Sequence, residues 1–232
     1  MVFVFLCCAG IMTISFITSC GKNKGTVSPA TSNIQFQVVN LSPDLQPVYL
    51  YVGLIRNSNT YYTYPNPSGY FSLNNINPPI QIRSTNPLIT STNIVSIDNV
   101  ILHPYFKYTL FLTGLRADSG VTSIFTVDTT TNPAAGRGKI RFVNASPHST
   151  SFDVSANGVL AFKDQKYKNV SPFIEMPPGN YDFKVMPAGQ GTVISTFPKV
   201  TIMDGKIYTL YCRGVAGGAD SVAFGTGIII NR

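Results

Sequence analysis

The chain has 232 residues, a formal net charge of +7, 44% hydrophobic residues and only 12% charged residues. This apolar content excludes a wholly disordered chain and is enough for the cores of one large or two ordinary domains. Glutamate occurs once, whereas tyrosine, phenylalanine, glycine and proline are abundant, which favours strands and turns over helices. We therefore expect an all-β protein.

The first predicted element is a secretion signal. Residues 2–18 carry no charge, and these 17 residues are short for a spanning helix but sufficient for a signal-peptide core. The next positions complete Ile-Thr-Ser-Cys at 17–20, which resembles the cleavage box of bacterial lipoproteins. The resemblance implies a signal peptide over 1–19, cleavage before Cys20 and lipid on the Cys20 sulfur. Buried acyl chains, at about 0.8 kcal/mol per methylene, would fasten the protein to a membrane.

Two points concern this leader. The same apolar run would also serve as an uncleaved N-terminal anchor helix, which is the alternative hypothesis. The run also begins without the Lys or Arg of most signal peptides, and a start codon assigned too far downstream explains that best. Residues 20–32 are expected to form a flexible tether.

The cysteine positions and the charge pattern argue against a disulfide-stabilised protein and against a nucleic-acid-binding protein. Three cysteines fall within the first twenty residues, so no disulfide framework is expected, and Cys212 stands in an apolar run where a small buried side chain is expected. The excess positive charge lies mainly in residues 132–232, without the dense patch and fold motif of a nucleic-acid site. We expect no nucleic-acid partner.

After the tether the chain repeats itself. Val-Asn-x-Ser-Pro occurs at 39–43 and again at 143–147, and "YTLFLTGL" at 108–115 is matched by "YTLYCRGV" at 208–215. The order is kept and the offsets are 104 and 100 residues, so two tandem units of about 100 residues are expected. Units of this length can each close a core, unlike the shorter repeats of solenoids.

The first unit, at 33–130, and the second, at 137–232, both show the period-two alternation of antiparallel strands. One face of each strand is expected in the core and the other in water. In "VYLYVGL" the core set extends to Leu54 and the outward set is Tyr49 and Tyr51. In "YTLFLTG" the outward set is Thr109, Phe111 and Thr113.

Turn signals punctuate these strands. Asn157-Gly158 and Asp204-Gly205 each predict a two-residue hairpin, and residues 129–138 are small, polar and turn-rich, as expected of a boundary. Seven or so short strands per unit describe a β-sandwich. We predict two tandem immunoglobulin-like antiparallel β-sandwiches after an N-terminal signal helix.

The second unit has four short motifs, namely Ala-Ser-Pro at 145–147, Asp-Val followed by Asn-Gly at 153–158, Pro-Gly-x-Tyr at 178–181 and Tyr-Thr at 208–209. In these motifs it resembles the bacterial family DUF 4397, a domain of unknown function. The first unit is similar but lacks the Asn-Gly hairpin. The resemblance implies an exported protein, often a lipoprotein of Bacteroidetes-like organisms, with no catalytic residues established. Because surface-exported lipoproteins of that phylum usually carry acidic residues after the lipidated cysteine, the spacer here favours the periplasmic face of the outer membrane.

No motif predicts catalysis. His103 and His148 are isolated, the carboxylates are scattered, and there is no calcium loop, nucleophile elbow or phosphate loop. We expect no enzyme, no metal site and no cofactor. A hydrolase with an unrecognised carboxylate site is the weakest of the hypotheses.

The sequence "NTYYTYPNPSGYF" is a candidate binding loop, because tyrosine rings with polar tips suit sugars and proteins. Its candidate residues are Tyr61, Tyr62, Tyr64 and Tyr70. The alternative is that these rings fill a core or cover a sheet edge.

Two short motifs, Asp-Thr-Thr at 128–130 and Asp-Ser-Val at 220–222, resemble the O-glycosylation sites of Bacteroidetes and make Thr129 and Ser221 candidate modification sites. Taken together, the sequence favours a non-catalytic envelope lipoprotein that binds a glycan or a protein partner. The alternative is a subunit of an adhesive or fimbria-like assembly whose exposed strand edges pair with partners.

Overall fold

A computed structural model describes residues 33–57, 59–73, 75–88, 92–197 and 199–232, which all belong to one compact unit, Ser32–Arg232. Cys20, the signal segment and the tether lie outside the described residues. The described chain has strands and one 3-10 turn at Asp220–Val222, and no α-helix, which confirms the all-β prediction. No helix among the described residues is long and apolar enough to cross a membrane.

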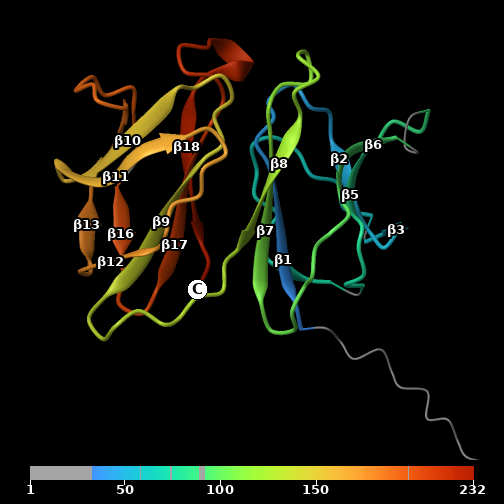
Figure 1. Ribbon diagram of the computed structural model, residues 1–232, viewed down its shortest axis with the longest axis horizontal. Coiled ribbons are helices and arrows are strands. Elements are labelled where there is room, and N and C mark those ends of the chain that lie inside the picture. The colour runs from blue at the N-terminus through green and yellow to red at the C-terminus, as the bar shows by residue number, and fades with distance from the viewer. Residues whose placement is uncertain (1–32, 58, 74, 89–91, 198) are drawn as a thin grey trace, which may run out of the picture. The chain divides into compact units, whose positions relative to one another are not determined.

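The first sandwich consists of the sheets β4-β1-β7-β8 and β3-β2-β5-β6 (Figure 1). Its strands are β1 Gln35–Asn40, β2 Val48–Val52, β3 Ile55–Arg56, β4 Phe71–Ser72, β5 Ile80–Ser84, β6 Asn93–Ile97, β7 Lys107–Thr113 and β8 Thr122–Val127. The apolar faces of the two sheets enclose one core, which includes Phe36, Leu50, Ile82 and Leu110.

The second sandwich repeats this plan with the sheets β12-β9-β17-β18 and β11-β10-β14-β15 and adds the pair β13-β16. Its strands are β9 Gly138–Asn144, β10 Ser151–Ala156, β11 Val159–Lys166, β12 Ile174–Met176, β13 Gly179–Tyr181, β14 Phe183–Pro187, β15 Ser195–Thr196, β16 Val200–Ile202, β17 Ile207–Arg213 and β18 Gly225–Ile230. In each sandwich one central pair is parallel, β1 with β7 and β9 with β17, so the sheets are not purely antiparallel.

The duplication extends to individual hydrogen bonds. The Asn of each Val-Asn-x-Ser-Pro motif accepts the N–H of the Ser two residues later, at 3.1 Å for Asn40 and 3.0 Å for Asn144. Tyr108 and Tyr208 are buried, and each hydroxyl accepts a backbone N–H from five residues upstream, at 2.8 and 3.1 Å. These contacts close equivalent turns, which is why the motifs recur at equivalent positions.

The expectation that one face of every strand lies in water is wrong for the sheets containing β1 and β9. Thr109, Phe111 and Thr113, predicted to be outward, are all buried. The cause is that the outer faces of the two sheets pack against each other and form a third apolar cluster. That cluster comprises Val39, Leu41, Phe111, Ile124, Val143, Ala145, Tyr211 and Ile229.

One turn prediction and one core prediction also need correction. Asn157-Gly158 does join β10 and β11, with φ of 48° and 82°. Asp204-Gly205 is a turn but not a hairpin, because β16 pairs with β13 whereas β17 pairs with β9 and β18. Leu54 is 62% exposed rather than in the core, because Gly53 and Leu54 form the turn between β2 and β3.

Candidate functional site

The predicted tyrosine loop does not form one exposed surface. Tyr61 is 58% exposed, but Tyr62 is only 4% exposed and belongs to the core of the first sandwich. The Tyr62 ring stacks on Phe71 with 6.2 Å between centroids, and its backbone bridges to Val48. Of these two adjacent tyrosines, only Tyr61 is available to a partner.

Tyr64 and Tyr70 instead connect the two sandwiches. Arg213 of the second sandwich lies 5.1 Å from the centre of the Tyr64 ring and donates a hydrogen bond to its hydroxyl. The Tyr70 hydroxyl donates to Asp128 at 2.7 Å and accepts from Asn231 at 2.8 Å. Burial, together with the Asp128 carboxylate, raises the pKa of Tyr70, so the phenol stays neutral. These rings serve the interface between the sandwiches.

The structure gives Tyr61 different neighbours, on the outer face of the sheet β3-β2-β5-β6. Tyr49 and Tyr51 point outward from β2, because Val48, Leu50 and Val52 occupy the core. The Arg56 guanidinium lies 4.9 Å from the centre of the Tyr49 ring, and that of Arg83 lies 4.4 Å from the centre of the Tyr51 ring. We call this surface, made by Tyr49, Tyr51, Tyr61, Arg56 and Arg83, the tyrosine–arginine face.

A shallow groove lies at one end of this face. Pro47, Tyr49, Tyr61 and Thr85 line a space of about 250 Å³. Two phenol rings and a proline provide flat apolar walls, and the threonine provides a hydroxyl. Walls of this kind stack against the ring of a sugar or an aromatic side chain.

Hydrogen bonds hold the two guanidinium groups in place. Arg83 donates from Nε to Asn93 at 2.9 Å and from Nη2 to Gln81 at 2.7 Å, and Arg56 donates from Nη2 to Asn59 at 2.6 Å. A guanidinium has five N–H donors, so each retains donors that these bonds do not use. The face is therefore a preorganised cationic surface interleaved with rings.

The corresponding face of the second sandwich has different chemistry. The strand registers align β10 with β2, β11 with β3 and β14 with β5. By these registers the positions of Tyr49, Tyr51, Arg56 and Arg83 are held by Asp153, Ser155, Leu160 and Met186. The fold thus tolerates other residues at these positions, and the tyrosine–arginine face is not a requirement of the sandwich.

Of the five residues of this face, only Tyr61 was predicted from the sequence as a binding residue. Alternation in "VYLYVGL" did place Tyr49 and Tyr51 outward, and the structure agrees. Arg56 and Arg83 come from strands that pair on either side of β2, and no local pattern indicates that pairing. Only the register of β2 with β3 and β5 brings the arginines beside the outward tyrosines.

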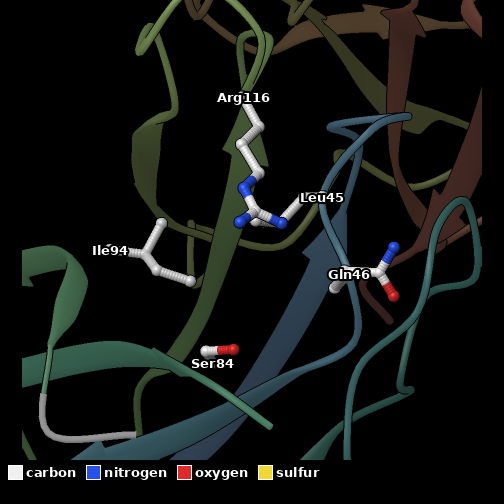
Figure 2. Close-up of a pocket in the computed structure, with 5 residues that line it drawn as sticks. All are labelled: Leu45, Gln46, Ser84, Ile94 and Arg116. Carbon is white, nitrogen blue, oxygen red and sulfur yellow. The ribbon is translucent and has the colours of Figure 1, made fainter. Parts of the chain in front are cut away.

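A second, smaller cavity lies in the same sandwich and is shown in Figure 2. Leu45, Gln46, Ser84, Ile94 and Arg116 line a space of about 80 Å³. Arg116 extends its guanidinium toward Leu45, and the side chains of Ile94 and Ser84 lie around the same space (Figure 2). This volume is well below that of ordinary ligand sites, so the cavity is too small to be the binding site.

The described carboxylates mostly serve the backbone or the interface. Asp44 accepts the N–H groups of Arg116 and Ala117, both at 2.8 Å. Asp153, in the family motif, accepts the N–H groups of Asp164 at 2.8 Å and Gly189 at 2.9 Å. Among the residues that the structure describes, no three His, Cys, Asp or Glu side chains gather where they would hold a metal ion.

The candidate modification sites differ in their surroundings. Ser221 is exposed within the 3-10 turn. Thr129 is also exposed, but its hydroxyl accepts the Lys107 N–H at 2.7 Å, and the preceding Asp128 is buried. A modifying enzyme that must contact the acidic residue of the motif could contact the exposed Asp220 but not the buried Asp128. His148 lies 2.8 Å from Asp118 in an exposed contact between the sandwiches.

Comparison with known proteins gives one family. The model of the family described as Domain of unknown function (DUF4397) matches residues 34–155 and 138–225. The two matches start at β1 and at β9, the equivalent first strands of the two sandwiches. No curated protein matches the chain.

Proposed function

The chain belongs to the DUF4397 family, and we propose that it is a non-catalytic lipoprotein of the cell envelope whose first domain binds a glycan. A protein partner at the same surface is the alternative. Residues 20–32 would tether the two sandwiches to lipid on Cys20, on the periplasmic side of the outer membrane. The observation that carries the binding proposal is the groove between Tyr49 and Tyr61 beside two fixed guanidinium groups.

The chemistry of the face favours an acidic sugar polymer. Tyr49 and Tyr61 supply stacking walls, while Arg56 and Arg83 supply donors suited to carboxylate or sulfate oxygens. All of these side chains come from strands of one sheet or from the segment beside it, so little order has to be gained on binding. The second sandwich lacks the same residues, which supports the first sandwich as the binding domain.

The binding test uses the mature protein without lipid and a panel of neutral and uronate-containing polysaccharides. We expect a uronate-containing polymer to bind and Tyr49→Ala or Tyr61→Ala to weaken that binding by about tenfold, which corresponds to about 1.4 kcal/mol. Tyr105→Ala is the matched control, because Tyr105 is 77% exposed but lies outside the face. Binding that survives both substitutions, or no binding to any polymer, would overturn the glycan proposal.

The anchor is tested separately. Cells expressing the full chain and treated with globomycin, which blocks lipoprotein cleavage, should accumulate an unprocessed precursor. Cys20→Ser should leave the protein unlipidated and absent from the membrane fraction. If neither treatment changes the processing of the chain, Cys20 is not a lipidation site, whatever the binding test shows.

A further inference from the structure

The strand β18 is an unprotected edge. It is the last strand of the sheet β12-β9-β17-β18 and pairs with β17 alone. Its sequence, "GTGIII", has no charged residue and no proline, which are the usual means of protecting an edge. The other long edge of this sandwich, β11, carries Lys163, Asp164 and Lys166 and has an irregular register.

The backbone of β18 offers free hydrogen-bonding groups. Asn231 donates its N–H to Ile207 of β17 at 2.8 Å. In an antiparallel pair the backbone groups of every second residue face the partner strand, so the N–H and C=O groups of Ile229 and Gly227 also face β17. Thr226, Ile228 and Ile230 therefore direct their N–H and C=O groups away from the sheet. Within the described part of the chain no backbone group pairs with them on that side.

The equivalent edge in the first sandwich has its last outward carbonyl paired. There, Asp128 donates its N–H to Lys107, so Val127 directs its carbonyl outward, as Ile230 does in the second sandwich. Arg141 donates to that Val127 carbonyl at 2.9 Å. The strand registers align Arg141 of the second sandwich with Gln37 of the first. Among the described residues, Gln37 makes no hydrogen bond to the Ile230 carbonyl that would correspond to the bond from Arg141 to Val127.

A groove runs beside the free edge. Gln37, Pro67, Gly69 and Tyr70 of the first sandwich face Ile228, Ile229 and Ile230 of β18 across a space of about 460 Å³. This volume is within the range of ligand sites. The lining has no charged side chain. Ile228 and Ile230 are 39% and 55% exposed, so the floor of the groove is aliphatic.

We propose that this groove binds an extended, uncharged segment of another protein, which adds a strand to β18. The free N–H and C=O groups at alternate residues match a β-strand and no other common ligand. Aliphatic residues at every second position of the segment would cover Ile228 and Ile230. The lining of the groove has no charged side chain, so it matches an uncharged segment, whereas the long edge β11 that a second copy would offer carries Lys163, Asp164 and Lys166. This surface is distinct from the tyrosine–arginine face.

The test uses nuclear magnetic resonance of the protein without its lipid and a lysine-flanked probe peptide whose centre is Thr-Val-Thr-Val-Thr-Val. At saturating peptide, amide exchange at Thr226, Ile228 and Ile230 should slow by about tenfold or more, because these N–H groups become paired. A peptide with proline at the central valine should give no slowing. Ile230→Lys should abolish the effect, whereas Val159→Lys, at a site 72% exposed on β11, should not.

Three results would overturn the proposal. The first is unchanged exchange at these three amides at millimolar peptide. The second is slowing that Ile230→Lys leaves intact. The third is slowing without peptide that grows with protein concentration, since that would make a second copy of the chain the occupant.

Discussion

Arg141 of the second sandwich and Asp128 of the first form an ion pair that is closed to water, with side chains 4% and 0% exposed. The pair is embedded in further hydrogen bonds. Arg141 donates from Nε to Thr209 at 3.0 Å, and Asp128 accepts from Tyr70 at 2.7 Å and from Thr109 at 2.5 Å. A charge pair buried across the contact fixes the position of one sandwich against the other. A shift of one sandwich along the other would leave both the Arg141 and the Asp128 charge buried without a partner.

Removing one partner of this pair should therefore be costly. Arg141→Met leaves the Asp128 carboxylate buried without its cation and should lower the free energy of unfolding by about 3–5 kcal/mol. Urea unfolding followed by circular dichroism measures this. The double variant Arg141→Met with Asp128→Asn should recover much of the loss, because no buried charge remains.

The control for that series is the more exposed pair Lys139–Glu175, with 3.8 Å between Nζ and Oε1. Glu175→Gln should change stability by about 1 kcal/mol or less, because water screens this pair. If Arg141→Met costs no more than Glu175→Gln, the buried pair does not hold the sandwiches together.

A substitution in the turn between β2 and β3 should increase the stability of the protein. Leu54 has φ of 68°, a left-handed conformation that costs an L-residue roughly 1–2 kcal/mol, and its side chain is 62% exposed. Leu54→Gly removes that cost with little loss of packing and should raise stability by about 1 kcal/mol. The equivalent position in the second sandwich is Gly158, with φ of 82°, so Gly158→Leu should have the opposite effect on the midpoint of thermal unfolding.

The sequence determined the repeat, the strand-rich fold and the outward direction of Tyr49, because each depends on local alternation or on a motif seen twice. It did not indicate that Phe111 is buried, since a strand face covered by another domain alternates in the same way as one in water. It left open whether Tyr62 and Tyr70 are exposed or packed, and the structure shows them packed. Their loop is polar and proline-rich, but the rings turn inward to a core and an interface that form only when distant strands meet.

Asp44 should make stability depend on pH in the acid range. Partial burial alone would raise the pKa of Asp44, but hydrogen bonds from the N–H groups of Arg116 and Ala117 outweigh it, and the pKa is lowered from 3.8. A lowered folded-state pKa stabilises the protein above the unfolded-state value, and this contribution is lost as the pH falls through the folded-state pKa.

Asp44→Asn should accordingly be less stable than the parent protein at neutral pH, and the gap should narrow below about pH 4. Unfolding in urea between pH 2.5 and 7 gives the two profiles. Asp182→Asn is the control, because Asp182 is exposed and its carboxylate accepts no hydrogen bond among the described residues, so this substitution should leave stability at neutral pH close to that of the parent protein. Parallel profiles for Asp44→Asn would mean that its carboxylate gains nothing from the two N–H groups.

Counting thiols tests the lipid anchor and the core of the second sandwich in one experiment. Cleavage before Cys20 would remove Cys7 and Cys8, so the mature chain would retain only Cys20 and Cys212. Burial raises the pKa of Cys212 to about 12, and its side chain has no exposed surface, so iodoacetamide at pH 8 should not modify the native protein. In urea, protein extracted from membranes should gain one adduct, at Cys212, because lipid blocks the Cys20 sulfur. Two adducts would show that Cys20 carries no lipid, and an adduct located at Cys212 in the native protein would show that β17 does not shield this thiol.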